Sequence, residues 1–106
     1  MDAITLYATW PDLPRAEAAA RALVERRLVA CVNLIPGVVS IYRWEGALQH
    51  DAEVVMIAKT SGEKAGAARD ALLEMHPYQL PCVTAFRIDS ALANTNFLNW
   101  MKDQTH

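Results

Sequence analysis

The sequence has no excess of basic residues, because 10 Lys and Arg stand against 12 Asp and Glu, for a formal net charge of −2. A nucleic-acid-binding surface needs a basic patch or stripe, so this balance excludes that class of partner. No apolar run approaches the ~20 residues that a membrane-spanning helix needs. Residues 1–4 contain neither a basic region nor a cleavage site, so we expect no signal peptide and a cytoplasmic protein.

Cysteine and glycine are scarce as well, with 2 and 4 residues respectively. Cys31 and Cys82 both have apolar, strand-like neighbours in the sequence, and nothing else indicates export. We therefore expect two buried thiols rather than a disulfide. The few glycines form no Gly-rich loop that could hold a phosphate or build an oxyanion hole. No Cys or His pair has the spacing of a Cys-x-x-Cys or His-x-x-x-His motif, so the sequence signal for a metal site is weak.

What the sequence does contain is one long β-rich stretch around a turn at Glu45-Gly46. The first run, Ala30 to Trp44, is about twice the usual strand length of roughly 5–6 residues, and a second run extends from Glu53 to Thr60. Pro36-Gly37 interrupts the first run, which predicts a bulge or bend. We expect a single domain over residues 1–106, whose body is too small to cover such arms. The hairpin therefore predicts an oligomer of identical chains.

The flanking segments complete a β-α-β-β-α-β order. We expect a first strand over Ala3–Trp10, a helix from the Asp12 cap to about Arg27, a second helix from Ser61 to His76, a fourth strand over Pro81–Ile88, and a last helix capped by Asn94 or Asn96. This order predicts an α+β fold, the ferredoxin-like split βαβ sandwich. Its antiparallel sheet has both main helices on one face, a long protruding β-hairpin and a short C-terminal helix.

Several sequence blocks resemble those of the CutA family, the divalent-cation-tolerance proteins. They include Ala30-Cys31-Val32-Asn33, Ser40-Ile41-Tyr42-Arg43-Trp44-Glu45-Gly46 and His76-Pro77-Tyr78. The resemblance extends over essentially the whole chain in the right order. It implies a tight homotrimer whose hairpins pair across subunits. It also implies a cytoplasmic role in tolerance to divalent metals, copper in particular, with no obligatory cofactor and no established catalytic activity.

The family theme makes potential copper ligands of interest, and copper favours thiolate and imidazole. The weak candidates are His76, Cys82 and Cys31, whereas His50 and His106 fit a solvated loop and a mobile terminus. Each candidate also has a purely structural interpretation. The cysteines can be small buried apolar residues. His76, at a helix end, can hydrogen-bond the last carbonyls and complement the helix dipole.

Two further positions differ from the family pattern. Some relatives carry a cysteine where Ala8 stands and a histidine where Met75 stands, and these differences argue against a family-type copper site. Relatives usually have an acidic residue at the position of Cys82, so this thiol could replace a carboxylate with a softer ligand.

The resemblance also places a polar and aromatic set around a cleft between subunits. Its members are Tyr42, Trp44, Glu45, Glu53, Lys59 and Tyr78. One interpretation is interface packing, with aromatic anchors and paired charges at the rim. The other is a pocket for a small ligand or anion, in which Lys59 supplies charge and Tyr78 a hydroxyl.

Two other classes of function, an enzyme and a signalling module, are alternatives to ion tolerance. A cysteine with His76 could form a nucleophile–base pair, but nothing in the sequence orients the histidine, so we expect no enzyme. The trimeric ferredoxin-like plan also resembles that of the nitrogen-regulatory PII proteins, which bind nucleotides at subunit clefts. A PII-like signalling module is therefore the alternative function, on the basis of fold analogy alone.

Overall fold

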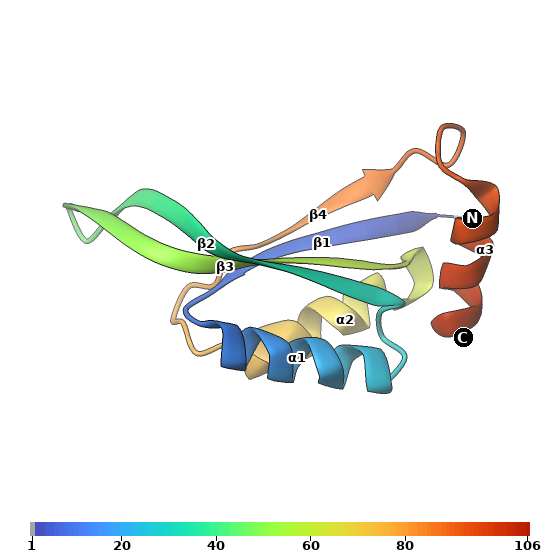
Figure 1. Ribbon diagram of the computed structural model, residues 1–106, viewed down its shortest axis with the longest axis horizontal. Coiled ribbons are helices and arrows are strands. Elements are labelled where there is room, and N and C mark those ends of the chain that lie inside the picture. Colours follow the sequence, from blue (N-terminus) through green and yellow to red (C-terminus); the bar gives the residue numbers. More distant parts are fainter. Residues whose placement is uncertain (1) are drawn as a thin grey trace.

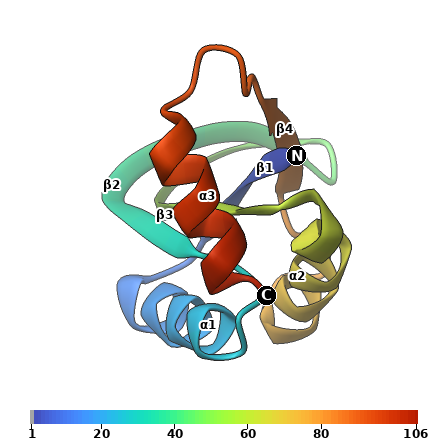
Figure 2. The same ribbon diagram turned by 90° about the vertical axis from the view of Figure 1, so that its right-hand side faces the viewer.

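A four-stranded antiparallel sheet forms the centre of the computed structural model, which describes residues 2–106. Its strands lie in the order β2-β3-β1-β4, with the bounds β1 (Ala3–Trp10), β2 (Cys31–Trp44), β3 (Ala47–Ser61) and β4 (Val83–Ile88). Helices α1 (Leu13–Glu25) and α2 (Gly62–Met75) cover one face, and α3 (Thr95–Gln104) lies across one end (Figures 1 and 2). The fold is therefore the predicted ferredoxin-like split βαβ arrangement.

The core lies between the sheet and the two main helices. Leu6, Ala8 and Trp10 of β1 alternate toward the helices, where they meet the small residues of α1 and Leu72 of α2. The buried residues of α1 are Ala16, Ala19, Ala20 and Leu23. Val24 is 41% exposed, because its position on the helix is turned away from the sheet.

Local signals explain where the helices begin and end. The Asp12 carboxylate accepts a hydrogen bond from the Arg15 amide at 2.9 Å, as expected for an N-cap. Helix α1 ends at Glu25, two residues before the predicted end, because Arg27 adopts a left-handed conformation (φ 58°) that reverses the chain. Asn94, rather than Asn96, caps α3.

The long hairpin has the predicted turn and bulge. Glu45 and Gly46 both have positive φ, 49° and 80°, as a two-residue hairpin turn requires. Residues 36–37 interrupt the register between Ile35 and Val38, and Gly37 has a φ of 79°. Strand β3 starts at Ala47, six residues before the predicted start, because its ladder with β2 continues to the turn.

The outer part of this hairpin, residues 38–53, extends beyond the rest of the sheet (Figure 1). The β1 ladder ends where Trp10 pairs with Val54, so residues 47–53 of β3 have β2 as their strand neighbour. Val39, Ile41 and Leu48 on this outer hairpin are 57%, 65% and 71% exposed. The expected mismatch between long apolar arms and a small body is therefore present.

The two faces of the sheet differ in what covers them. Val32 and Leu34 of β2 pack against the core, so Cys31, Asn33 and Ile35 alternate to the opposite, open face.

No helix of residues 2–106 is both long and apolar enough to cross a membrane.

Candidate functional site

A cavity of about 640 Å³ lies at the base of the outer hairpin. We call it the hairpin cavity, and its lining residues are Thr9, Tyr42, Arg43, Trp44, Glu53 and residues 77–82. It is therefore built from the end of β1, both hairpin strands and the loop after α2. Four of the six residues predicted around a cleft come together here, namely Tyr42, Trp44, Glu53 and Tyr78.

Two tyrosine–carboxylate hydrogen bonds order the polar side of this region. The Tyr78 hydroxyl donates to Glu53 Oε2 at 3.0 Å, and Glu53 is only 7% exposed. The Tyr42 hydroxyl donates to the carboxylate of Asp51. Burial, together with the bond to Glu53, raises the pKa of Tyr78 above its ordinary value, and the bond to Asp51 raises that of Tyr42. Both phenols are therefore neutral donors at physiological pH.

His76 fixes the loop that forms one wall of the cavity. It is buried, its Nε2 lies 2.7 Å from the Thr9 carbonyl oxygen, and its Nδ1 accepts from the Tyr78 amide at 3.2 Å. These partners define the neutral tautomer with the proton on Nε2. The ring also stacks on Trp10, with centroids 4.3 Å apart. The expected contact with the carbonyls of its own helix is replaced by a bond across to β1.

The two cysteines do not occupy the buried positions expected of them. Cys82 is exposed and lines the hairpin cavity, because β4 begins only at Val83 and leaves this residue in the loop. Cys31 is half-buried on the open face of the sheet. It pairs with Lys59, whereas Thr9 pairs with Val55, so about 13 Å of strand separates it from the His76 contact. Both thiols are free.

Two predicted cleft residues lie outside the cavity lining. Lys59 donates from Nζ to Asn33 Oδ1 at 2.7 Å, six residues along β3 from Glu53. Glu45 occupies the hairpin turn. The hairpin cavity is therefore not the expected anion pocket, because Lys59, the residue expected to supply the positive charge, does not line it. Sequence reasoning missed Thr9 and Arg43 as lining residues, although Arg43 stands between two aromatic candidates.

The candidate metal ligands are only partly brought together. His76 and Cys82 belong to the same end of the sheet, and Cys31 does not. His76 would have to give up a hydrogen bond to coordinate a metal. Within residues 2–106, no group of three or more His, Cys, Asp or Glu side chains is arranged to hold a metal ion.

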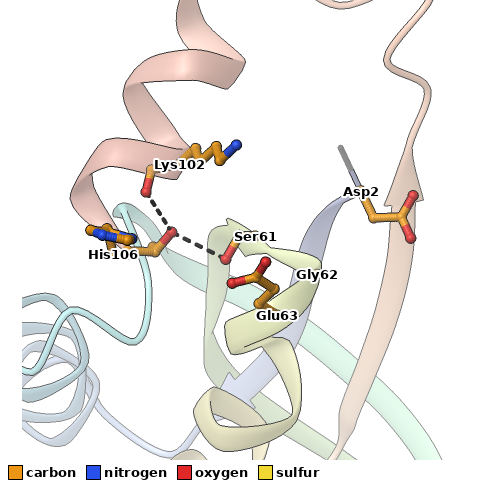
Figure 3. A pocket seen from close by; sticks show the side chains of 7 residues that line it. Asp2, Ser61, Gly62, Glu63, Lys102 and His106 are labelled. Atoms are coloured by element: carbon orange, nitrogen blue, oxygen red, sulfur yellow. Dashed lines mark hydrogen bonds between the residues drawn. The ribbon is translucent and has the colours of Figure 1, made fainter.

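A second cavity, of about 500 Å³, lies between the start of α2 and the end of α3 (Figure 3). Its lining residues are Asp2, Ser61, Gly62, Glu63, Lys102, Thr105 and His106. The Thr105 hydroxyl lies 3.1 Å from Ser61 Oγ, which ties the end of α3 to the end of β3. His106, expected at a mobile terminus, is exposed at the edge of this cavity. The hydrogen bond at this second cavity therefore has a structural role, because it holds two elements of the fold together.

Comparison with known proteins identifies the family. A family model described as CutA1 divalent ion tolerance protein matches residues 4–104. The human Protein CutA is 39% identical over 99 residues, which are 93% of this chain and 54% of the human protein. The chain thus spans about half the length of that relative.

Solved structures agree with this assignment. A crystal structure of CutA from Xylella fastidiosa superposes with a TM-score of 0.93 at 36% identity, over 100% of both chains. A structure described as the PII-like protein CutA from Nostoc sp. PCC 7120, in apo form, has a TM-score of 0.90 at 36% identity, over 100% of this chain and 98% of that one. The chain therefore belongs to the CutA1 divalent ion tolerance family.

Proposed function

We propose that this member of the divalent ion tolerance family acts as a cytoplasmic homotrimer that binds copper or another divalent cation weakly and without catalysis. The observation that carries the proposal is the outer hairpin, whose apolar side chains extend beyond the core of their own subunit. Burying each large apolar side chain is worth about 1.5–3 kcal/mol. Association of identical chains would recover this free energy for Val39, Ile41 and Leu48.

The strand order supports a closed ring. The sheet edges are β2 and β4, which differ in length and sequence. Pairing β2 of one copy with β4 of the next is a head-to-tail contact, and such contacts close into rings when the rotation allows. Ring closure would also satisfy both exposed edges, which otherwise invite aggregation. The number of three subunits comes from the CutA resemblance.

Two of the three predicted metal ligands belong to the same end of the sheet, which favours a site of low affinity. Cys82 contributes an exposed thiol, and His76 immediately precedes the loop that carries Cys82. Copper prefers thiolate and imidazole ligands, so Cys82 and His76 are the first ligands we propose. Cys31, on the open face, would need ligands from another subunit.

The assembly and the metal site have separate tests. Light scattering at micromolar concentration should report three subunits, and a monomer would contradict the proposed assembly. Calorimetric titration with copper should show binding that weakens in Cys82→Ser and in His76→Ala. Unchanged affinity in both variants would remove these residues from the metal site.

The cytoplasmic setting rests on the two free thiols. A protein with an exposed free cysteine such as Cys82 suits a reducing compartment. Cell fractionation decides this point, because recovery of the protein outside the cytoplasmic fraction would contradict it.

The alternative function is a PII-like signalling module that binds a small ligand at the subunit cleft. The hairpin cavity favours it, because about 640 Å³ lies within the range of ~300–1,000 Å³ typical of small-molecule sites. Aromatic rings and a buried carboxylate line the same space. A ligand-binding screen by protein NMR would test this function, and the absence of any bound small molecule would contradict it.

A further inference from the structure

The hairpin cavity contains a buried carboxylate that has no cationic partner among residues 2–106. Glu53 is 7% exposed, and its side chain has one hydrogen bond, from the Tyr78 hydroxyl. The ion pairs found within residues 2–106 are Arg15–Asp12, Arg69–Asp70 and Arg87–Asp2, so none involves Glu53. Buried charges in proteins are usually paired, because removing a charge from water is costly. A cation is therefore the missing complement of this site.

Aromatic rings line the same cavity as the carboxylate. Tyr42, Trp44 and Tyr78 come from the hairpin and from the loop after α2. The face of an aromatic ring attracts a cation within about 6 Å of its centroid. Tyr78 bonds Glu53, and Tyr42 pairs with Gln49 whereas Trp44 pairs with Ala47, so Tyr78 and Tyr42 are the rings nearer to the carboxylate. Because the bond to Tyr78 holds Glu53 in place, the charge of the site is already oriented before a ligand arrives.

The basic residue of the lining, Arg43, lies toward the other end of the hairpin. It pairs with Leu48, five residues along β3 from Glu53, which corresponds to about 17 Å of strand. Its Nη1 is 3.4 Å from the carbonyl oxygen of Gly46 in the turn, and donates to it. Arg43 is therefore held toward the turn and does not neutralise Glu53.

We propose that the hairpin cavity binds a small organic ammonium ion with an apolar or aromatic body. The ammonium group donates hydrogen bonds to the Glu53 carboxylate, and the body lies against Tyr42 and Tyr78. This inference rests on the alternative proposed function, small-ligand binding at the cleft, and it specifies the ligand as a cation. Nucleotide phosphates are disfavoured, because they would approach a buried negative charge.

A matched pair of probes tests the proposal. NMR titration of the uniformly ¹⁵N-labelled protein at pH 7 would use 2-phenylethylammonium and, as a neutral analogue of similar shape, 2-phenylethanol. We expect the ammonium probe to shift the amide signals of residues 78–80 and of Cys82, and to bind about tenfold or more tightly than the alcohol. Equal affinities would reduce the site to an apolar cavity and overturn the proposal, as would the absence of binding by either probe.

Variants locate the effect on the proposed residues. Glu53→Gln keeps the shape of the side chain and should lose the preference for the ammonium probe. Asp70→Asn removes one negative charge from the exposed side of α2 and should retain the preference for the ammonium probe. Tyr42→Leu provides a second variant if Glu53→Gln fails to fold, and it should weaken ammonium binding. An unchanged preference in Glu53→Gln, or unchanged ammonium affinity in Tyr42→Leu if the former is unfolded, would overturn the proposal.

The same experiments separate this inference from the proposed metal site and trimer. Cys82→Ser should weaken copper binding and leave the ammonium preference intact. Light scattering on each variant reports the assembly independently. An ammonium preference lost in Cys82→Ser as well would contradict the assignment to Glu53.

Discussion

At the scale of single residues, His76 has the largest structural role in the candidate site. Its ring joins the end of β1, through the Thr9 carbonyl, to the loop at Tyr78, and it stacks on the buried Trp10. Both ring nitrogens are used, so the side chain is a connector between segments far apart in the sequence.

Replacing His76 with Phe should keep the stacking and remove both hydrogen bonds. The Thr9 carbonyl and the Tyr78 amide lose their histidine partner, and an unsatisfied buried polar group costs about 1–3 kcal/mol. We expect a lower free energy of unfolding in urea and faster amide exchange at residues 78–80 and at Cys82. His106→Phe is the control, because His106 is exposed and lies outside the proposed interface. Equal stability of the two variants would show that the bonds of His76 contribute nothing.

Tyr78 predicts a dependence of stability on alkaline pH. Its pKa is raised by burial and by the bond to Glu53, so the folded chain holds this proton more tightly than the unfolded chain does. The contribution is present below the ordinary tyrosine pKa of about 10 and is lost as the pH rises toward the folded-state value. We expect the denaturation midpoint to fall less steeply above about pH 10 in Tyr78→Phe than in the wild type. Parallel pH profiles would contradict the shift.

At the scale of elements, the hairpin depends on backbone positions that L side chains rarely adopt. Gly37 in the bulge has a φ of 79°, and an added Cβ there would meet no atom within 4 Å. A substitution at this position therefore tests the backbone conformation separately from packing.

Gly37→Ala should destabilise the protein by about 1–2 kcal/mol, because a left-handed conformation is unfavourable for alanine. Gly66→Ala is the matched control, since this glycine lies in α2, also has open space around it and has no positive φ. The control should stabilise by about 0.4–1 kcal/mol. Thermal denaturation of both variants measures the difference, and an equal shift in both would rule out strain at the bulge.

At the scale of elements, features formed by neighbouring residues could be predicted from the sequence, whereas features that depend on distant segments could not. Asp12, Asn94, Pro36-Gly37 and Glu45-Gly46 could be interpreted from the sequence, because caps, bulges and turns depend on residues only a few positions apart. The exposure of Cys82 and the position of Lys59 could not, because they depend on strand ends and on register between distant segments. The partner of His76 is 67 residues away in the chain.

The six residues predicted around a cleft show the same limit of local sequence patterns. Tyr42, Trp44, Glu53 and Tyr78 line one cavity of the subunit, whereas Glu45 and Lys59 do not. The cleft between subunits that the family resemblance implies stays a prediction. Nothing in the local pattern around Lys59 distinguishes it from Glu53, since both lie on the same strand. Glu53 lines the cavity and Lys59 does not, and this difference can be seen only once the lengths of the neighbouring strands are known.

At the scale of the whole molecule, the outer hairpin links the stability of each subunit to the proposed trimer. Ile41→Asp would place a charge in the centre of the proposed interface, where an unpaired buried charge is costly. We expect loss of the trimer together with a large fall in melting temperature, measured by light scattering and calorimetry. Val24→Asp introduces the same charge on α1 and should leave the trimer intact. A stable folded monomer of Ile41→Asp would show that the hairpin is not shared core.

The position of β1 between β3 and β4 also bears on how the chain is made. Ala3 pairs with Ser61 on one side and with Ile88 on the other, so the first strand of this sheet to be synthesised is completed by the last. A hairpin forms within about 1–10 μs, whereas synthesis of residues 62–88 takes on the order of seconds at about 5–20 residues per second. The β2–β3 arms can therefore pair while β4 does not yet exist, and a nascent chain carries their apolar side chains exposed throughout that interval.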